Sequence, residues 1–393
     1  MKVCFICPEY PEGPHGGIGS MVQIISRELV HLGHQVRVIG VYPKNYPAPD
    51  HENDLGVEVW RLREKRGKFG WILPYMQQFR IIKKWSEKGE IEIIEAPDSR
   101  GWIAFWSKLT VPVILRAHGS NTYFSNILGT HLNFLTSIIE KKSYQRADYL
   151  ASVSHYTAKI TKELFKLFKD FVVIHNGIEI PRIDDRLIRD PNTAIFSGSL
   201  NKKKGIFELI EGALLLLNAN TQIVLKIFGK DTLDQAGGSV KETLIKLIPE
   251  EFKNNIVFEG HVSRKILIEE YKKCTLAIFP SYAEAFAIAP LESMVCGCPT
   301  IYTTMGSGPE LIQDGEDGLL INPADPKEIA DAIKRILRDP DFAIKIGNEG
   351  RKKVIEYFSK ELMVKNSLEF YQKCIMDFQS KIGSKEKDRR NER

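Results

Sequence analysis

Short runs of apolar and β-branched residues alternate with segments of helical period along the first half of the chain. The clearest helical segment is Ser20–Leu32, whose apolar residues recur on one face and which stops at Gly33. Such alternation is typical of α/β proteins with parallel sheets. The runs predict strands over residues 2–7, 35–42, 57–62, 92–96, 112–118, 149–154 and 171–176.

The same alternation restarts after residues 179–193. This stretch is polar, contains two prolines and has neither a helical nor a strand period. A final helical region runs from Pro326 to about Gln379 and breaks near Pro340. Strands are predicted over residues 194–198, 222–229, 255–260, 274–281, 299–303 and 318–322.

This pattern predicts two Rossmann-like, doubly wound α/β domains that face each other across a cleft. A chain of 393 residues is also too long for a single core. We expect an N-terminal domain over residues 1–183, joined by the C-terminal helix 359–379. A linker, 184–193, would lead to a C-terminal domain over 194–356. Ligands of such sheets bind beyond the carboxyl ends of the strands, so functional residues should lie in the loops that follow strands.

Composition adds little, because 43% hydrophobic and 27% charged residues are ordinary for a globular protein. The net charge of +5 is uneven: residues 1–190 hold 26 Lys+Arg against 21 Asp+Glu, and the remainder holds 29 of each. A nucleic-acid-binding protein would need a broader basic surface. No nucleic-acid partner is therefore expected.

Cysteines and apolar stretches bear on the compartment. Cys4 and Cys7 have metal-ligand spacing, but they lie in a predicted strand, whose successive side chains point to opposite faces. Without a second pair, we expect buried thiols in a reducing compartment and no zinc site. The apolar run after Lys2 ends at Pro8, and the uncharged stretch 117–139 is too polar to cross a bilayer. A cytoplasmic protein is expected.

The first candidate loop is "PHGGIGS", residues 14–20, which follows the first strand and precedes a helix. Gly16 and Gly17 would let the backbone approach a ligand, with helix N–H groups behind them. A plain tight turn accounts for the glycines equally well. The spacing is not GxGxxG, which argues against a nicotinamide-dependent dehydrogenase.

The second is "FSGSLNKKKGIFELI", residues 196–210. Three consecutive lysines, Lys202–Lys204, follow a predicted strand, and Gly205 opens an amphipathic helix. Ammonium groups at such a place suit a diphosphate. The alternative is a solvated basic turn.

The third is "EAFAIAPLE", residues 284–292, in which two carboxylates enclose an apolar stretch. We expect Glu284 in a loop and Glu292 in the first turn of a helix that begins near Pro290. The backbone amides of residues 287–289 would then face an anion. For Glu292 the alternative is a helix-capping carboxylate, whereas no cap explains Glu284.

Taken together, these segments resemble the family 4 glycosyltransferases, which have the GT-B fold, retain anomeric configuration and use nucleotide-sugar donors. The resemblance covers roughly residues 1–355. It rests on "GGIG", "RAHG" (116–119), "HNGIE" (175–179), "GSLNKKKG" (198–205), "EAFAIAPLESMVCGCPTI" (284–301) and "GSGPELIQDGEDGLLINPAD" (306–325).

The resemblance implies residue roles. Glu284 would hold hydroxyls of the transferred sugar, Lys204 the phosphates, and Glu292 the ribose hydroxyls. His118 would lie near the reactive carbon and the C6 hydroxyl of the sugar, which makes His118, Glu284 and Lys204 the implied catalytic residues. Loop 260–264 is expected to contact the base. The implied substrate-binding residues are Gly16, Gly17, Asn176, Ser199, Lys203, Val262, Phe286, Ala287, Ile288, Ala289 and Glu292.

Two positions depart from the family pattern. Ser199 stands where the family usually has arginine, so Lys203 or Lys202 would replace the missing cation. Ala287 stands where a glycine is usual and would crowd the sugar. Carboxylates suited to bridging a diphosphate through a metal ion are missing, since "IDDRL" lies in the linker. The resemblance therefore implies a metal-independent, retaining hexosyltransferase without a cofactor, using a UDP- or GDP-sugar.

The acceptor side is suggested by residues 61–88, which hold nine basic and two acidic residues interleaved with aromatic ones. This mixture suits an anionic lipid surface. It indicates a peripheral enzyme at the inner face of the cell membrane, acting on a glycan or lipid-linked acceptor in envelope polysaccharide synthesis. The alternative is a solvated helix whose apolar side packs on the first domain.

Two rival functions stay open. A sugar-nucleotide epimerase of the non-hydrolysing type also has two such domains, although its motifs do not match the Glu284–Glu292 segment. A catalytically silent nucleotide-sugar-binding homologue is the second, suggested by Ser199 and Ala287. The epimerase would release an isomerised sugar without an acceptor, and the silent homologue would release no product.

Overall fold

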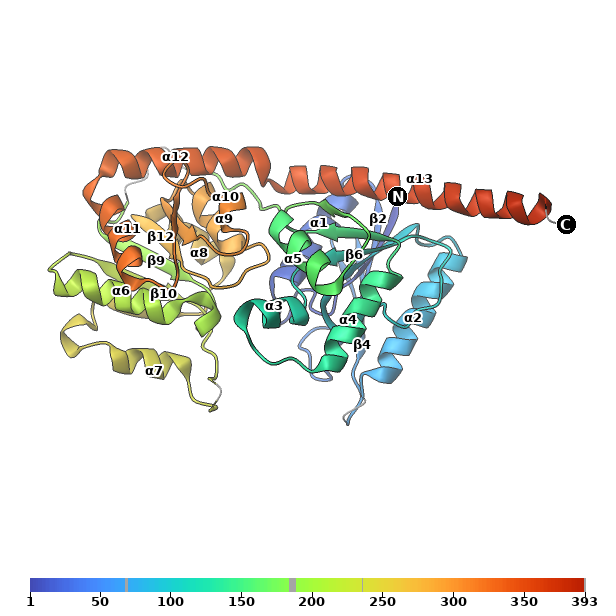
Figure 1. Ribbon diagram of the computed structural model, residues 1–393, viewed down its shortest axis with the longest axis horizontal. Helices are drawn as coiled ribbons and strands as arrows, with labels where there is room; N and C mark the ends of the chain where they lie inside the picture. The colour runs from blue at the N-terminus through green and yellow to red at the C-terminus, as the bar shows by residue number, and fades with distance from the viewer. Residues whose placement is uncertain (68–69, 184–188, 235, 392–393) are drawn as a thin grey trace. The chain divides into compact units, whose positions relative to one another are not determined.

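The chain forms two compact units. The computed structural model describes all residues except 68–69, 184–188, 235 and 392–393 (Figure 1). Unit 1 comprises Met1–Gly177 together with Lys360–Arg393, and unit 2 comprises Ile178–Ser359. Residues 184–188 of the predicted linker lie outside the described residues.

Among the described residues, unit 1 is built on an eight-stranded sheet with the strand order β3-β4-β2-β1-β5-β6-β7-β8. Neighbouring strands are parallel, except that β3 is antiparallel to β4. All strands predicted for the first half are present. The strands are β1 (Lys2–Ile6), β2 (Gln35–Tyr42), β3 (His51–Asp54), β4 (Val57–Arg63), β5 (Ile93–Pro97), β6 (Val113–Ala117), β7 (Tyr149–Ser152) and β8 (Phe171–Val173).

Strand β3 was not predicted, because "HEND" has no apolar alternation. It forms at the edge of the sheet through a tight turn in which Leu55 and Gly56 have φ values of 51° and 94°. The helices of unit 1 are α1 (Gly17–His31), α2 (Ile72–Glu87), α3 (Asn121–Leu128), α4 (Phe134–Arg146), α5 (His155–Phe165) and α13 (Lys360–Asn391), with a 3₁₀ turn at Ser99–Gly101. Helix α1 begins at Gly17, three residues before the predicted start.

The sheet of unit 1 is covered on both faces, and β1 shows why its sequence is apolar throughout. Val3 and Phe5 pack with α1 and α13, whereas Cys4 and Ile6 pack with α2 and α4. Cys7 belongs to the cluster on the α1 face, opposite Cys4. The predicted placement of the two thiols on opposite faces is confirmed.

Helix α13 contributes to the core of unit 1 from the far end of the chain. Its Tyr371 donates a hydrogen bond to Glu95 Oε2 (2.7 Å), and Glu95 forms an ion pair with Arg116 (2.8 Å). Tyr371, Glu95 and Arg116 are all buried. Apolar residues of α13, among them Met363 and Phe370, fill the same cluster as α1. The C-terminal helix is therefore an integral part of unit 1.

Unit 2 has, within its described residues, a six-stranded parallel sheet with the order β11-β10-β9-β12-β13-β14. Every strand predicted for the second half is present. The strands are β9 (Thr193–Ser197), β10 (Val224–Phe228), β11 (Ile256–Gly260), β12 (Leu276–Phe279), β13 (Thr300–Thr303) and β14 (Leu319–Ile321). The helices are α6 (Ile206–Asn218), α7 (Val240–Leu247), α8 (Arg264–Lys273), α9 (Ile288–Val295), α10 (Gly308–Leu311), α11 (Pro326–Arg338) and α12 (Pro340–Tyr357), with 3₁₀ turns at Lys202–Lys204 and Glu250–Phe252.

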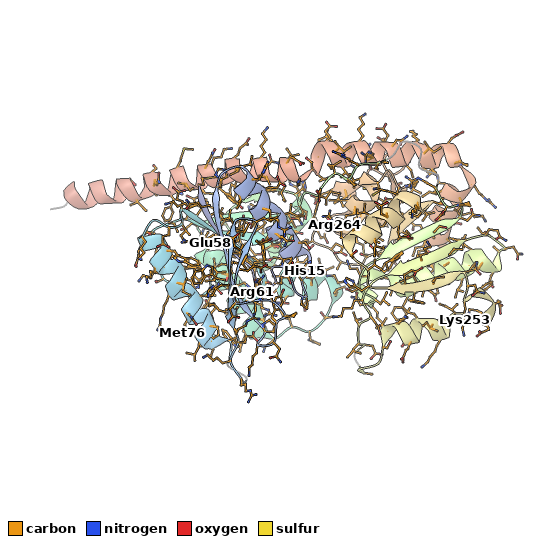
Figure 2. All side chains as sticks on the ribbon, turned by 180° about the vertical axis from the view of Figure 1, so that it is seen from behind. His15, Glu58, Arg61, Met76, Lys253 and Arg264 are labelled. Carbon is orange, nitrogen blue, oxygen red and sulfur yellow. The ribbon has the colours of Figure 1, made fainter. Side chains whose placement is uncertain are left out.

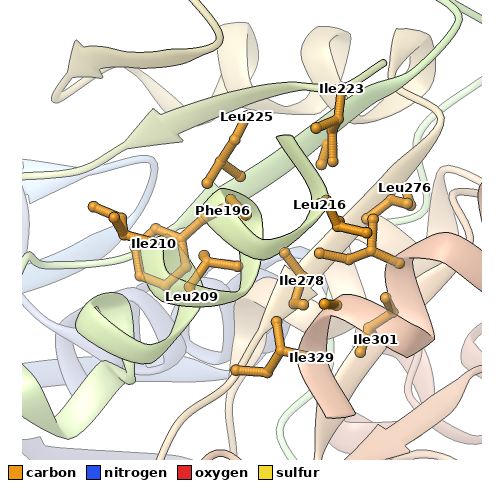
Figure 3. Close-up of a cluster of buried hydrophobic side chains, with 14 of the residues drawn as sticks. Phe196, Leu209, Ile210, Leu216, Ile223, Leu225, Leu276, Ile278, Ile301 and Ile329 are labelled. Carbon is orange, nitrogen blue, oxygen red and sulfur yellow. The ribbon is translucent and has the colours of Figure 1, made fainter. Parts of the chain in front are cut away.

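One large core lies between the sheet of unit 2 and helices α6, α7 and α11 (Figure 3). Phe196 and Ile278 reach it from the central strands, and Leu209 and Ile329 from the helices. Burying each such side chain contributes roughly 1.5–3 kcal/mol. Pro340 starts α12 directly after α11 ends, which confirms the predicted break.

Strand order identifies where each sheet can bind a ligand. The chain leaves β9 toward β10 and β11, and then returns to the other side of β9 with β12. Such a topological switch point opens a crevice at the carboxyl ends of β9 and β12. In unit 1 the same reversal lies between β1 and β5. Among the described residues, we find no helix with the length and apolar character needed to cross a membrane.

Candidate active site

The lysine turn lies at the switch point of unit 2. Lys202–Lys204 form a single 3₁₀ turn, capped by the side chain of Asn201, which accepts a hydrogen bond from the Lys204 amide (3.2 Å). Gly205 ends the turn at φ 67°, and a Cβ there would lie 1.9 Å from the carbonyl oxygen of Pro280. Only glycine fits both conditions. Gly205 therefore lets the lysine turn pack directly against the end of β12.

Two contacts join the loops that follow β9 and β12. The Tyr282 amide donates to the Lys203 carbonyl (2.8 Å), and the Lys204 ammonium forms an ion pair with the Glu284 carboxylate. Glu284 is buried, and although desolvation alone would raise its pKa, Lys204 and Lys203 lower it below the usual range. Burial lowers the pKa of Lys203 to about 8, which leaves it mostly charged at neutral pH. Lys202 is exposed.

Glu292 lies in the second turn of α9, because the helix begins at Ile288 rather than near Pro290. It is too far along the helix to cap it, so the capping interpretation of Glu292 is wrong. The carboxylate is buried and accepts a hydrogen bond from Arg264 Nε (2.5 Å). Burial raises the pKa of Glu292, and Arg264 opposes that shift. Figure 2 labels Arg264 on α8.

The segment between the two glutamates is compact. Phe286 and Ala287 are buried, and Phe286 packs against Phe358 at 5.7 Å between ring centroids. Ala287 is the N-cap of α9 at φ −83°, a conformation open to any residue, so a methyl group there strains no backbone. The amides of Ile288 and Ala289 begin the helix.

Glycine follows β9 and β10 directly and ends β11, at the same edge of the sheet of unit 2. The Gly198 amide donates to Phe228 O (2.9 Å) and the Gly229 amide to Gly260 O (2.8 Å). A Cβ on Gly229 would lie 1.8 Å from Gly198 O, so the backbones approach closely. We call Gly198, Gly229 and Gly260 the glycine shelf. Ser199 follows Gly198 in the sequence and is exposed, and Val262 is half-buried.

In unit 1 the glycine loop after β1 is held from several directions. Gly16 is the N-cap of α1, and the Gly19 amide in its first turn donates to Glu9 Oε1 (3.0 Å). Tyr46 donates to the carbonyl oxygens of Tyr10 (3.1 Å) and Pro14 (3.2 Å). A carboxylate thus already satisfies one of the helix-terminal amides, while the amides of Gly16 and Gly17 remain predicted ligand contacts.

His118 follows β6, and a buried carboxylate fixes its backbone. Asp98 accepts hydrogen bonds from the His118 amide (3.0 Å) and from the Tyr144 hydroxyl (2.9 Å). Burial raises the pKa of Asp98 to about 7. Burial, aided by Arg116, lowers the pKa of His118 to about 3, so its imidazole is neutral at physiological pH. Asn176 is buried, and its Oδ1 has no hydrogen-bond partner among the described residues.

Sequence reasoning missed the roles of Glu9 and Asp98, and it included Arg264 in loop 260–264 as an expected contact of the base, not as the partner of Glu292. Arg264 did carry a signal: it is the first residue of a helix, where the helix dipole disfavours a cation unless an acid lies nearby. Glu9 and Asp98 follow strands, but nothing in the sequence indicates which amides they accept from.

Solved structures show that this fold is GT-B. Sucrose-phosphate synthase from Thermosynechococcus elongatus superposes with a TM-score of 0.76 at 19% identity, covering 95% of this chain and 99% of the other. Anabaena Alr3699/HepE, solved in complex with UDP and glucose, superposes with a TM-score of 0.75 at 15% identity, covering 95% and 100%. The fold and the family matches together define a glycosyltransferase of the GT-B class.

The chain belongs to glycosyltransferase family 4, glycosyl transferases group 1. The family described as Glycosyltransferase Family 4 matches residues 15–182, and the one described as Glycosyl transferases group 1 matches residues 181–353. A full-length relative is the uncharacterized glycosyltransferase MJ1607 of Methanocaldococcus jannaschii, 26% identical over 94% of this chain and 98% of the relative.

Proposed function

We propose that the protein transfers a hexose, with retention and without a metal ion, from a UDP- or GDP-sugar to a hydroxyl of a glycan or lipid-linked acceptor. The observation that carries the proposal is the arrangement at the switch point of unit 2. There two buried carboxylates, Glu284 and Glu292, each bind a partly exposed cation, Lys204 and Arg264. The partly exposed Lys204 can turn to an anionic ligand when one arrives, because Lys203 also stabilises the Glu284 carboxylate.

The donor would use these groups in order along its length. The diphosphate is matched by the ammonium groups of Lys204 and Lys203, which replace the arginine missing at Ser199. Glu284 is placed to accept hydrogen bonds from sugar hydroxyls once Lys204 turns to phosphate. Glu292 would accept them from the ribose, beside the glycine shelf formed by the ends of β9, β10 and β11.

In the transfer step, the bond between the anomeric carbon and the phosphate oxygen breaks, and its electron pair goes to the diphosphate. The lysine turn stabilises the charge that develops there, a role a metal ion plays in other transferases. The acceptor oxygen attacks from the same face, which retains configuration, and its proton passes to the leaving phosphate. A neutral His118 would act here as a hydrogen-bonding group and not as a charged acid.

A thermal-shift panel tests the donor. UDP, GDP, ADP and CMP and their sugar conjugates are added with and without EDTA, because a ligand that binds only the folded state raises the melting temperature. We expect one nucleotide to stabilise the protein regardless of EDTA, and Glu292→Ala to lose the effect. Glu269→Ala, which removes an exposed carboxylate of α8, is the matched control.

Other results would favour the rivals. No stabilisation by any nucleotide at millimolar concentration would favour the silent homologue. Release of an isomerised sugar from the conjugate, without acceptor, would favour the epimerase. Transfer or hydrolysis of the donor would exclude the silent homologue.

The acceptor side rests on helix α2. The structure confirms the packing interpretation for one face, since Ile82 and Trp85 are buried in the core of unit 1. The other face begins with Trp71, Leu73 and Met76, which are 45%, 63% and 43% exposed (Figure 2 labels Met76). Exposed basic residues, Arg80, Lys83 and Lys84, follow. Apolar residues beside cations are the composition of a helix that lies in an anionic membrane interface.

Vesicle co-sedimentation tests this surface. We expect binding to phosphatidylglycerol vesicles that weakens with salt, little binding to phosphatidylcholine, and a clear loss in Leu73→Ser/Met76→Ser. Leu215→Ser, at a similarly exposed leucine of unit 2, should bind as the unaltered protein does. Equal binding by the two variants would remove α2 as the membrane surface.

A further inference from the structure

Glu292 is a buried acid with one charged partner. The residue is 7% exposed, and Arg264 Nε lies 2.5 Å from its Oε1. Among the described residues, Oε2 of Glu292 accepts no hydrogen bond. A carboxylate buried this deeply tends to take up a proton unless a cation offsets the cost of desolvation.

Other titratable groups near Glu292 do not supply that charge. Tyr271, on α8, donates or accepts a hydrogen bond with Ser197 (2.5 Å), and burial raises its pKa well above the usual range. Cys296, one turn further along α9, has its pKa raised to about 12 by burial. Both are therefore neutral near pH 7. Arg264 is the group of positive charge that faces Glu292.

The position of Arg264 is unfavourable without this contact. It is the first residue of α8, which is capped by Ser263, and a helix N-terminus repels a cation. Its side chain is 42% exposed, so only its inner edge is engaged by Glu292. The ion pair therefore offsets two unfavourable effects: the repulsion between Arg264 and the helix N-terminus, and the desolvation of the buried Glu292 carboxylate.

We propose that Arg264 is a positioning residue for nucleoside recognition: it keeps Glu292 ionised and oriented, with Oε1 engaged and Oε2 available to accept hydrogen bonds from the ribose. The inference rests on the proposed function, in which Glu292 binds the ribose, and adds a residue to it. Arg264 itself need not touch the nucleotide.

Calorimetric titration of the full chain tests the inference. UDP, GDP, ADP and CMP are first titrated into the unaltered protein, and the nucleotide that binds is used with Arg264→Ala, Arg264→Lys and the control Lys265→Ala, an exposed neighbour on α8. At pH 6 we expect Arg264→Ala to bind about tenfold more weakly. Without the arginine, the charge-assisted hydrogen bond between the Glu292 carboxylate and the ribose is lost. At pH 8.5 the loss should shrink, because a carboxyl group that has lost its cation is more fully ionised at higher pH. Lysine should restore most of the affinity at both pH values.

The 2′-deoxynucleotide separates positioning from direct contact. The unaltered protein should prefer the ribonucleotide to the 2′-deoxynucleotide. Arg264→Ala at pH 6 should lose that preference, and so should the separate variant Glu292→Gln. A loss equal at both pH values, with the ribose preference intact, would overturn the inference and indicate that Arg264 binds phosphate or base. Unchanged binding would also overturn it. If no nucleotide binds the unaltered protein, the proposed function itself fails, which is a distinct result.

Discussion

The two units build the same kind of sheet and use its carboxyl edge in opposite ways. In unit 2 the Lys204–Glu284 ion pair joins the loops after β9 and β12, and the Arg264–Glu292 ion pair joins α8 to α9. Both cations are partly exposed. In unit 1 the corresponding loops are held by hydrogen bonds between side chains and backbone groups. The Tyr46 hydroxyl donates to a carbonyl before the glycine loop, and the Asp98 carboxylate accepts from the His118 amide. The carboxyl edge of unit 2 therefore carries an ion pair whose lysine can turn to a ligand, whereas the loops at the carboxyl edge of unit 1 are held in place by hydrogen bonds to the protein backbone.

The difference follows from what each contact can do when a ligand arrives. A partly exposed lysine such as Lys204 can turn to a phosphate at modest cost, because Lys203 also stabilises the charge of the Glu284 carboxylate that it leaves. A buried hydrogen bond cannot be given up so easily, because the groups it leaves behind remain desolvated. Substitutions in unit 2 should therefore affect binding and turnover, and substitutions in unit 1 should affect stability first.

The largest effect is expected at Glu284. Glu284→Ala should lower turnover by about 10³-fold, because hydrogen bonds to the sugar in the transition state are lost. Nucleotide binding should persist, since Lys204 remains and loses its competing partner. Turnover and nucleotide affinity are measured together, with Glu259→Ala on β11 as the control. Unchanged turnover would defeat the assignment.

Next comes Arg61 in unit 1, which is buried and reaches the glycine loop from β4 (labelled in Figure 2). It pairs with Glu52 (2.6 Å) and donates to the carbonyl of Pro11 (2.8 Å). Arg61→Ala should lower the free energy of unfolding by about 3 kcal/mol, because the buried Pro11 carbonyl and the half-buried Glu52 carboxylate lose their partner. Denaturant titration measures it against the exposed Arg66→Ala. If Arg61→Ala also reduced nucleotide affinity to the same extent, the expected difference between substitutions in unit 1 and in unit 2 would not hold.

Asp98 gives a pH-dependent version of the same contrast. Its folded pKa of about 7 lies above that of an unfolded aspartate, so the folded state holds the extra proton and loses stability as pH rises toward 7. Asp98→Asn removes this titration. The stability of that variant relative to the unaltered protein should rise by about 2 kcal/mol between pH 5 and pH 8. A difference independent of pH would show that Asp98 is ionised throughout.

The smallest effect is expected at Lys204. Lys204→Ala should weaken nucleoside diphosphate binding about tenfold, the value of one charge-assisted hydrogen bond. Stability should change little, because the lysine is partly exposed and Glu284 can take up a proton. Affinity is measured by calorimetry, with Lys246→Ala at an exposed lysine of α7 as the control. Unaltered affinity would move the phosphate contact to Lys202 or Lys203.

How much of this the sequence predicts depends on the range of the interactions. Strands such as β9 and β12 are evident because their apolar runs satisfy both faces of a buried sheet, and Gly205 because it precedes an amphipathic helix. The edge strand β3 is not, since its polar residues form a strand only through pairing with β4.

The site shows the same limit. Glu284, Glu292 and Lys204 could be nominated from spacing and resemblance, but their pairing could not. Arg264 and Glu292 are brought together by the packing of α8 beside α9, and the register of α9 places Glu292 beyond the helix cap. Side-chain partners across elements depend on tertiary packing, which a local pattern does not encode.

The return of α13 to unit 1 sets an order for folding during synthesis. Unit 2 is one continuous stretch, whereas the core of unit 1 lacks Met363, Phe370 and Tyr371 until the end of the chain emerges. At about 5–20 residues per second, the gap between the end of the first segment at Gly177 and the arrival of Tyr371 is roughly 10–40 s. During that time Glu95 and Arg116 lack the contacts that α13 makes with them. The segment made first is thus the last to be completed, and a chain released early would carry a finished unit 2 beside an open unit 1.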